Sequence, residues 1–202
     1  MKKIALASLL SVLVVSGANA TTNYFVGGGF DLSTTDTDET TILRISPLFG
    51  WKLNSNWDMG VVANFGYDET YFPRNHAVSG NVYKYGADVF ARYKVAQMGG
   101  IKLLLMSSVG ADFSTYVSDD FPAMDGETLT SLSASIVPMV TYDITESFTL
   151  YARLNFLGLY ADYQFKNEDM GVMDNSWFFT VFANSSDVAN TGEFQIGFLY
   201  NF

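Results

Sequence analysis

An all-β chain, folded as an eight-stranded antiparallel up-and-down barrel that crosses a membrane, is the fold class that the sequence predicts. Three observations lead to it. Hydrophobic residues make up 49% of the chain and aromatic residues 16%, yet no apolar run beyond the first twenty residues has the length of a membrane helix. Apolar and polar residues alternate instead, with the period of two that a β-strand requires. Short and long connections also alternate, which is typical of membrane barrels.

The first element is a predicted secretory signal peptide. Two lysines are followed by a short apolar core, and Ala18 and Ala20 have the small side chains of a cleavage site. The apolar core is shorter than the roughly 20 residues of a spanning helix. We therefore expect a cleaved signal peptide at residues 1–20 and a single barrel domain at residues 21–202.

Eight strands long enough to cross a membrane at a tilt are predicted next. They lie at residues 23–32, 42–53, 57–68, 82–95, 101–114, 129–144, 148–163 and 191–202. Short turns are expected at 54–56, 96–100 and 145–147, and long loops at 33–41, 69–81, 115–128 and 164–190. In an even-stranded membrane barrel the short turns face the periplasm and the long loops face the outside.

Charged residues fix which face of each strand points inward. The charged side chains of the strands all fall opposite the apolar face, and they are Asp31, Arg44, Lys52, Asp58, Asp68, Lys84, Asp88, Arg92, Lys94, Lys102, Asp112, Asp143, Arg153 and Glu193. A lysine or arginine turned to hydrocarbon at the bilayer midplane costs about 2–4 kcal/mol. Alternation alone would also fit a soluble barrel with an apolar core. Aromatic residues at both strand ends and glycines on the charged face favour the membrane barrel.

An ionic network is expected inside the barrel. Its predicted members are Asp31, Arg44, Asp88, Arg92, Asp112, Arg153 and Glu193, with the arginines paired to the carboxylates. In so narrow a barrel such a network would block the lumen, and each pair would offset part of the desolvation cost of its members. The sequence therefore predicts a closed or barely conducting barrel, in which the network either serves a function or only stabilises the fold.

Three segments depart from plain alternation. Pro47 and Pro138 interrupt two strands at matching places, and each is expected to mark a β-bulge. Residues 177–183, WFFTVFA, are too apolar for an ordinary loop. We expect them to prolong the last strand above the membrane, with a break at 184–190, and a surface contact patch is the alternative.

The last strand carries a pattern of one polar residue, one glycine and two aromatic residues, at Gln195, Gly197, Tyr200 and Phe202. This pattern resembles the C-terminal signal that the barrel-assembly machinery of bacterial outer membranes reads. With the proline-to-aromatic pattern and FARYKV at residues 90–95, the chain resembles the small outer-membrane β-barrel domain family, of the OmpX and OmpA-membrane-domain kind. The resemblance implies a Gram-negative outer membrane, both termini in the periplasm, and contact with outer-membrane lipids and lipopolysaccharide.

The composition narrows the possible functions. A net charge of −10 argues against nucleic acid as a partner, and the absence of cysteine excludes a disulfide framework. No motif indicates a cofactor, a metal site or a catalytic residue, and a monomer is expected. Function in such barrels generally lies on exposed loops. The acidic loops therefore favour a non-enzymatic role in envelope integrity, adhesion or contact with a host or surface ligand.

Two other classes of function stay open. The first is a small or gated porin-like channel for small molecules. The second is a lipid A-modifying enzyme, in which a histidine would act with serine or carboxylate partners. His76 is the only histidine, and no serine motif around it matches such enzymes.

Overall fold

The computed structural model describes residues 23–35, 40–71, 79–117, 125–155, 157–167, 174–182 and 194–202. The predicted signal peptide, its cleavage site and His76 lie outside these residues. The regular secondary structure of the described part is all β. No helix there has the length and apolar character needed to cross a membrane.

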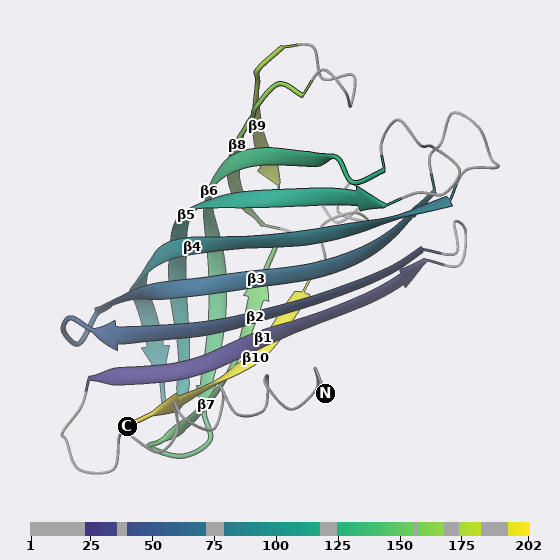
Figure 1. The fold of residues 1–202 in the computed structure, drawn as a ribbon. Coiled ribbons are helices and arrows are strands. Elements are labelled where there is room, and N and C mark those ends of the chain that lie inside the picture. Colours follow the sequence, from purple (N-terminus) through teal and green to yellow (C-terminus); the bar gives the residue numbers. More distant parts are fainter. Residues whose placement is uncertain are drawn as a thin grey trace.

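Ten strands form one antiparallel sheet (Figure 1). They are β1 (Tyr24–Thr35), β2 (Thr40–Lys52), β3 (Trp57–Tyr71), β4 (Ser79–Met98), β5 (Ile101–Val117), β6 (Thr128–Asp143), β7 (Phe148–Leu154), β8 (Gly158–Gln164), β9 (Ser176–Phe182) and β10 (Phe194–Asn201). Eight of them close into a barrel in the order β1-β2-β3-β4-β5-β6-β7-β10, because β10 pairs with both β7 and β1. The predicted eight-stranded up-and-down barrel is confirmed.

The two ends of the barrel differ in their connections. The turns after β2, β4 and β6 are short and gather at the same end as the start of β1 and the C-terminus (Figure 1). We call this the short-turn end and the opposite one the loop end. Gly99, with a φ of 59°, makes the two-residue turn between β4 and β5, where a residue with a Cβ would be strained.

Apolar side chains cover the outside of the barrel, as the charge pattern predicts. Phe65 is 54% exposed, Val89 55% and Val109 64%, and they lie on adjacent or nearly adjacent strands. Water would not tolerate so continuous an apolar wall, whereas acyl chains solvate it. Ring pairs lie at both borders of this wall. Trp57 and Tyr93 lie 4.8 Å apart near the short-turn end, and Tyr67 and Tyr83 lie 5.5 Å apart near the loop end.

The predicted seventh strand, residues 148–163, is two strands rather than one. The short-turn half of β6 pairs with β7, where Val140 faces Ala152, and the other half pairs with β8, where Ile136 faces Leu159. Four steps along β6 thus correspond to seven along the strands that face it, so the chain between the two ladders is three residues longer than the matching part of β6. Pro138 lies opposite this break and has no N–H to donate.

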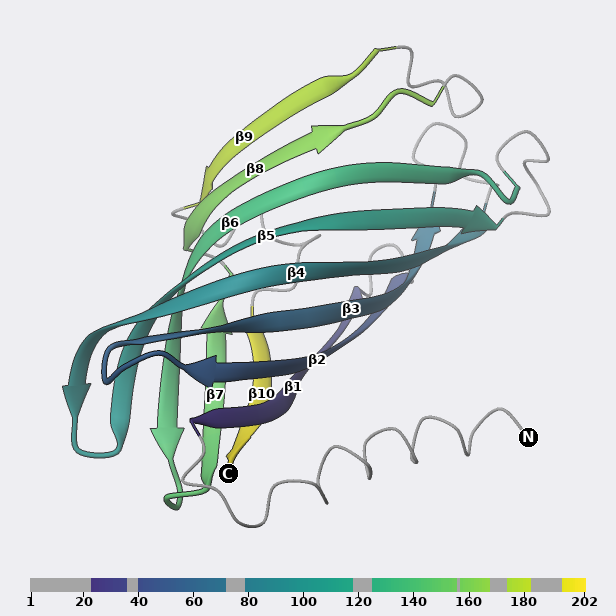
Figure 2. The ribbon, with the colours of Figure 1, turned by 60° about the vertical axis from the view of Figure 1, so that its left-hand side comes forward.

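The apolar segment at 177–183 continues the wall of the barrel. Its first six residues belong to β9, which pairs with β8 as the predicted prolongation of the last strand would. Figure 2 shows β6, β8 and β9 side by side, while β7 and β10 run behind them. Among the described strands β9 has no partner on its other edge. The predicted break at 184–190 lies outside the described residues.

The prediction of a bulge is wrong at Pro47, where the registers of β2 with β1 and with β3 run unchanged. At Pro138 the register with β5 is unchanged, but the ladder on the other side of β6 shifts by three residues between β7 and β8. A further register shift lies between Lys94 and Ala96 on β4. Proline removes a ladder hydrogen bond, but it does not require an inserted residue.

Candidate functional site: the barrel lumen

The middle of the lumen is filled with apolar side chains from all eight strands of the barrel. This buried cluster, the apolar plug, consists of Phe25, Leu48, Val62, Phe90, Leu104, Met106, Met139, Tyr151 and Leu199. Phe25, Phe90 and Met139 are each 1% exposed. A cavity of about 10 Å³ remains beside the plug, which is room for at most about one water molecule.

Arg92 closes the plug on the side of the short-turn end. Its guanidinium lies over the ring of Phe25, 4.5 Å from the centroid, and 5.3 Å from that of Phe90. It also donates from Nε to Oδ1 of Asp58 at 2.5 Å. The charge is therefore held by two aromatic faces and one carboxylate, which offsets the cost of its burial.

Inward glycines leave the room that these large side chains occupy. A Cβ at Gly60 would overlap the carbonyl oxygen of Phe49 and lie 2.7 Å from Cζ of Phe90. A Cβ at Gly197 would overlap the carbonyl oxygen of Gly28 and the ring of Tyr151. Glycine on the inner face thus lets aromatic rings from neighbouring strands cross a narrow lumen.

A chain of hydrogen bonds crosses the lumen on the loop side of the plug. Gln195 donates from Nε2 to Oγ of Ser46 at 3.0 Å, and Ser46 donates from Oγ to Oδ1 of Asn64 at 2.9 Å. Asn64 in turn donates from Nδ2 to Oδ2 of Asp88 at 2.6 Å. Four strands, β10, β2, β3 and β4, are tied together by this chain, and each buried polar group in it finds a partner.

The remaining charges of this level pair differently from the prediction. Asp68 is bound by Lys84 and lies 3.6 Å from Arg44. Asp112 accepts a hydrogen bond from Ser133 at 2.7 Å. Arg153 donates to Ser135 at 3.2 Å and makes no ion pair with a carboxylate of the described residues.

Among the described side chains, Arg44 and Arg92 pair with Asp68 and Asp58, which were not among the seven predicted members of the ionic network. The network as a whole stays a prediction. The lumen is blocked by apolar side chains, with ionic and hydrogen-bonded layers above and below them. The side chain of Asp31 and all of Glu193 lie outside what the structure describes.

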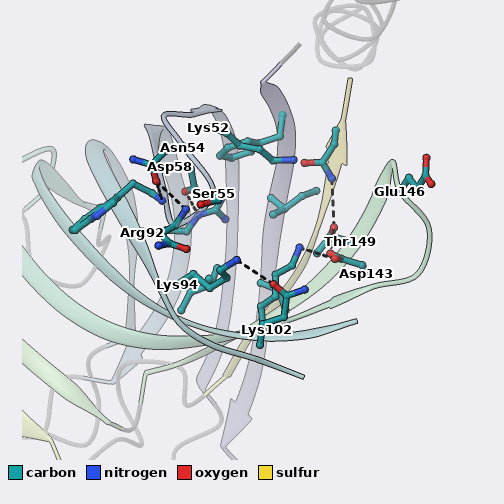
Figure 3. A pocket seen from close by; sticks show the side chains of 18 residues that line it. Lys52, Asn54, Ser55, Asp58, Arg92, Lys94, Lys102, Asp143, Glu146 and Thr149 are labelled. Carbon is teal, nitrogen blue, oxygen red and sulfur yellow. Dashed lines mark hydrogen bonds and ion pairs between the residues drawn. The ribbon is translucent and has the colours of Figure 1, made fainter. Parts of the chain in front are cut away.

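A pocket of about 280 Å³ opens at the short-turn end, below the plug (Figure 3). Four cationic side chains line it, namely Lys52, Arg92, Lys94 and Lys102. The acidic ones are Asp58, Asp143 and Glu146. Amide and hydroxyl groups of Asn54, Ser55, Asn56, Gln97, Thr141, Thr149 and Asn201 complete the rim, and Phe25, Leu104 and Leu199 form an apolar floor.

Sequence reasoning missed both the plug and the pocket. The plug does leave a signal, because apolar residues stand on both faces of a strand at its level, as in the run Leu103–Met106 and the pair Val61 and Val62. The pocket leaves none in a single strand, since its lysines come from β2, β4 and β5.

The C-terminal motif lies in and just after β10, the strand that closes the barrel. Gln195 takes part in the hydrogen-bond chain, Gly197 makes room for Tyr151, and the ring of Tyr200 lies 5.2 Å from that of Phe202. Each of these residues therefore has a structural task, and their reading by the assembly machinery stays a prediction. In the described part of the chain no group of histidine, cysteine and acidic residues could hold a metal ion.

Known proteins resemble this chain only weakly in sequence. Neither a protein-family model nor a curated protein matches the chain. Among solved structures, Neisserial surface protein A is 15% identical over 91% of this chain and 100% of its own, with a TM-score of 0.49. Ail, the attachment invasion locus protein of Yersinia pestis, is 12% identical over 89% and 95%, with a TM-score of 0.38. A major outer membrane protein of Thermus thermophilus is 14% identical over 89% and 98%, with a TM-score of 0.44.

Proposed function

We propose that this protein is a non-conducting, non-enzymatic barrel of the Gram-negative outer membrane that presents acidic loops at the cell surface. Its role would lie in envelope integrity, adhesion or contact with a host or surface ligand. The observation that carries the proposal is the apolar plug, to which every strand of the barrel contributes. A lumen filled in this way leaves the outer wall and the loops as the surfaces that can act.

The predicted export signal at residues 1–20, the C-terminal motif and the apolar outer wall support this location. In this orientation the short-turn end faces the periplasm and the loop end faces the outside. Outer-membrane lipids and lipopolysaccharide are then its immediate neighbours, and the barrel-assembly machinery is its partner during insertion.

Conductance in planar bilayers tests the closed lumen. We expect purified wild-type protein to give no steady conductance steps. The double variant Phe25→Ala/Phe90→Ala removes two rings from the plug and is expected to conduct, because ions could then pass the middle of the lumen. The matched control Phe65→Ala/Val89→Ala removes apolar groups from the lipid-facing wall and should stay closed. Large steady steps from the wild type would support the alternative of a porin-like channel.

Cells with and without the protein distinguish the remaining roles. Sensitivity to detergent measures envelope integrity, and retention on coated surfaces measures adhesion. Mass spectrometry of lipid A addresses the enzymatic alternative, for which we expect an unchanged acyl pattern. A pattern that changes with the protein would instead assign catalysis to it.

A further inference from the structure

The short-turn pocket has a built-in surplus of positive charge. Arg92 is paired with Asp58 at 2.5 Å, and Lys102 is paired with Asp143 at 2.6 Å. Lys52 and Lys94 make no ion pair with the described part of the chain, and Lys94 binds only the amide oxygen of Gln97, at 3.1 Å. Two ammonium groups thus remain without a carboxylate in a chain whose net charge is −10.

The lysine side chains that carry this positive charge lie around one pocket. Figure 3 shows Lys52, Lys94 and Lys102 around the same hollow, while the carboxylate of Glu146 points away from it. Lys52 is repelled by Lys102 and Arg92 and attracted by Asp58 and Asp143, two carboxylates that are already paired with those cations. Like charges that converge on a half-enclosed space raise the local concentration of anions there. An anion between them would relieve the repulsion.

The lining also limits the kind of anion. Leu104, Leu199 and the ring of Phe25 form a floor that suits an apolar group, whereas the rim offers amide and hydroxyl groups. A volume of about 280 Å³ lies just below the range for drug-sized ligands, about 300–1,000 Å³, and so suits a smaller molecule. A convergent set of polar groups above an apolar base is the usual design of such sites.

We propose that the short-turn pocket binds a small organic anion, with its carboxylate between the ammonium groups of Lys52 and Lys94 and its apolar part on Leu104 and Leu199. A short peptide that ends in a free carboxylate and carries small apolar side chains has this chemistry. The floor of the site is the apolar plug, so the site belongs to the closed barrel. The pocket would give the barrel a second functional surface, at the end opposite the loops.

Titration calorimetry on the folded protein in zwitterionic detergent, in chloride buffer, tests the proposal with N-acetyl-alanyl-alanine as the probe. We expect saturable binding that weakens as salt is raised from about 0.01 to 0.1 M, over which the screening length falls from about 30 to 10 Å. The C-terminal amide of the same dipeptide has the same shape without the charge and should not bind. Backbone amide shifts on titration should be largest at residues 54–57.

The double variant Lys52→Gln/Lys94→Gln should lower the affinity at least about tenfold, and Lys166→Gln, the same type of change at the loop end, should leave it unchanged. A heat-dependent shift in gel migration shows that each variant is folded. Inorganic phosphate should bind more weakly than the dipeptide, because it lacks the apolar part. Absence of saturable binding, equal binding of the amide, undiminished binding by the double variant, or tighter binding of phosphate would each overturn the proposal.

The conductance of the same sample is measured separately. Absence of binding would therefore refute the proposed site without refuting the proposed closed lumen. A conducting wild type that still binds the dipeptide would in turn refute the proposed function and keep the site.

Discussion

Two glycines on the inner face of β3 show how strongly position decides the effect of a single residue. At Gly60 an added Cβ would overlap the backbone of β2 and crowd the ring of Phe90. At Gly66, three inward positions nearer the loop end, the nearest atom would be Cβ of Lys84 at 3.3 Å. The overlap at Gly60 is with a carbonyl oxygen at 2.2 Å, whereas the contact at Gly66 needs a shift of only a few tenths of an ångström.

We therefore expect Gly60→Ala to destabilise the folded barrel by about 1–3 kcal/mol, the usual cost of overpacking. Gly66→Ala should change stability by less than about 1 kcal/mol, because alanine also restricts the unfolded chain and so compensates for a small clash. Urea unfolding in lipid vesicles, followed by tryptophan fluorescence, measures both. Equal losses of stability in the two variants would show that the crowding at Gly60 is relieved elsewhere.

Single residues were also where the sequence was least informative. The direction of each charged side chain followed from alternation, and Arg44, Asp88, Arg92 and Arg153 do point inward. The residues with which they pair could not be predicted, because pairing across the lumen depends on the register between strands. Arg92 and Asp58 face each other in the ladder of β3 and β4, a register that alternation within one strand does not contain.

At the scale of the strands, β8 and β9 carry the largest departure from an ideal barrel. The outward face of β9 presents Trp177, Phe179 and Val181, opposite Tyr163, Ala161 and Leu159 of β8. The rings of Tyr163 and Trp177 lie 4.6 Å apart, and that of Phe165 lies 5.0 Å from Tyr163. A row of apolar residues that ends in clustered amphipathic rings is typical of a strand that reaches the membrane interface. We infer that β9 lies against lipid.

Fluorescence of Trp177 alone tests this placement. The variant Trp51→Phe/Trp57→Phe leaves Trp177 as the one tryptophan, since the chain has three. We expect strong quenching by lipids brominated near the head group and weak quenching by aqueous iodide, because the ring is 76% exposed from the protein but would be covered by lipid. The variant Trp51→Phe/Trp177→Phe keeps Trp57 as a control at the other border. Efficient iodide quenching without a response to brominated lipid would place β9 in water.

The number of strands in the barrel could be predicted, and so could the face of each strand that points inward. The division of the predicted seventh strand into two could not. Residues 148–163 alternate well enough to suggest one strand. The break between β7 and β8 lies opposite Pro138 of β6, which is on a different strand. A break defined by the pairing of two strands cannot be seen in the alternation of one strand.

At the scale of the whole molecule, the two ends of the barrel differ in their connections. The pocket and the short turns lie at one end, and the long connections lie at the other. The apolar plug separates them. The proposed orientation can be tested directly, because the chain contains no cysteine and a single introduced thiol has no background.

Ser55 lies in the turn between β2 and β3, and Asp174 lies between β8 and β9. With the short turns in the periplasm, a membrane-impermeant maleimide should label Asp174→Cys on intact cells and Ser55→Cys only after the outer membrane is opened. The reversed pattern would invert the topology. Labelling of both on intact cells would indicate that the barrel is not inserted.

The pairing of β1 with β10 brings together the first and the last strands of the described chain, and it governs when the wall can close. A polypeptide that stops short of Phe194 leaves the edges of both β1 and β7 without a partner at the depth of the acyl chains, where each unsatisfied backbone group costs several kcal/mol. Translation errors that truncate the product therefore yield chains that no bilayer accepts. The final strand thus decides whether the wall can close at all.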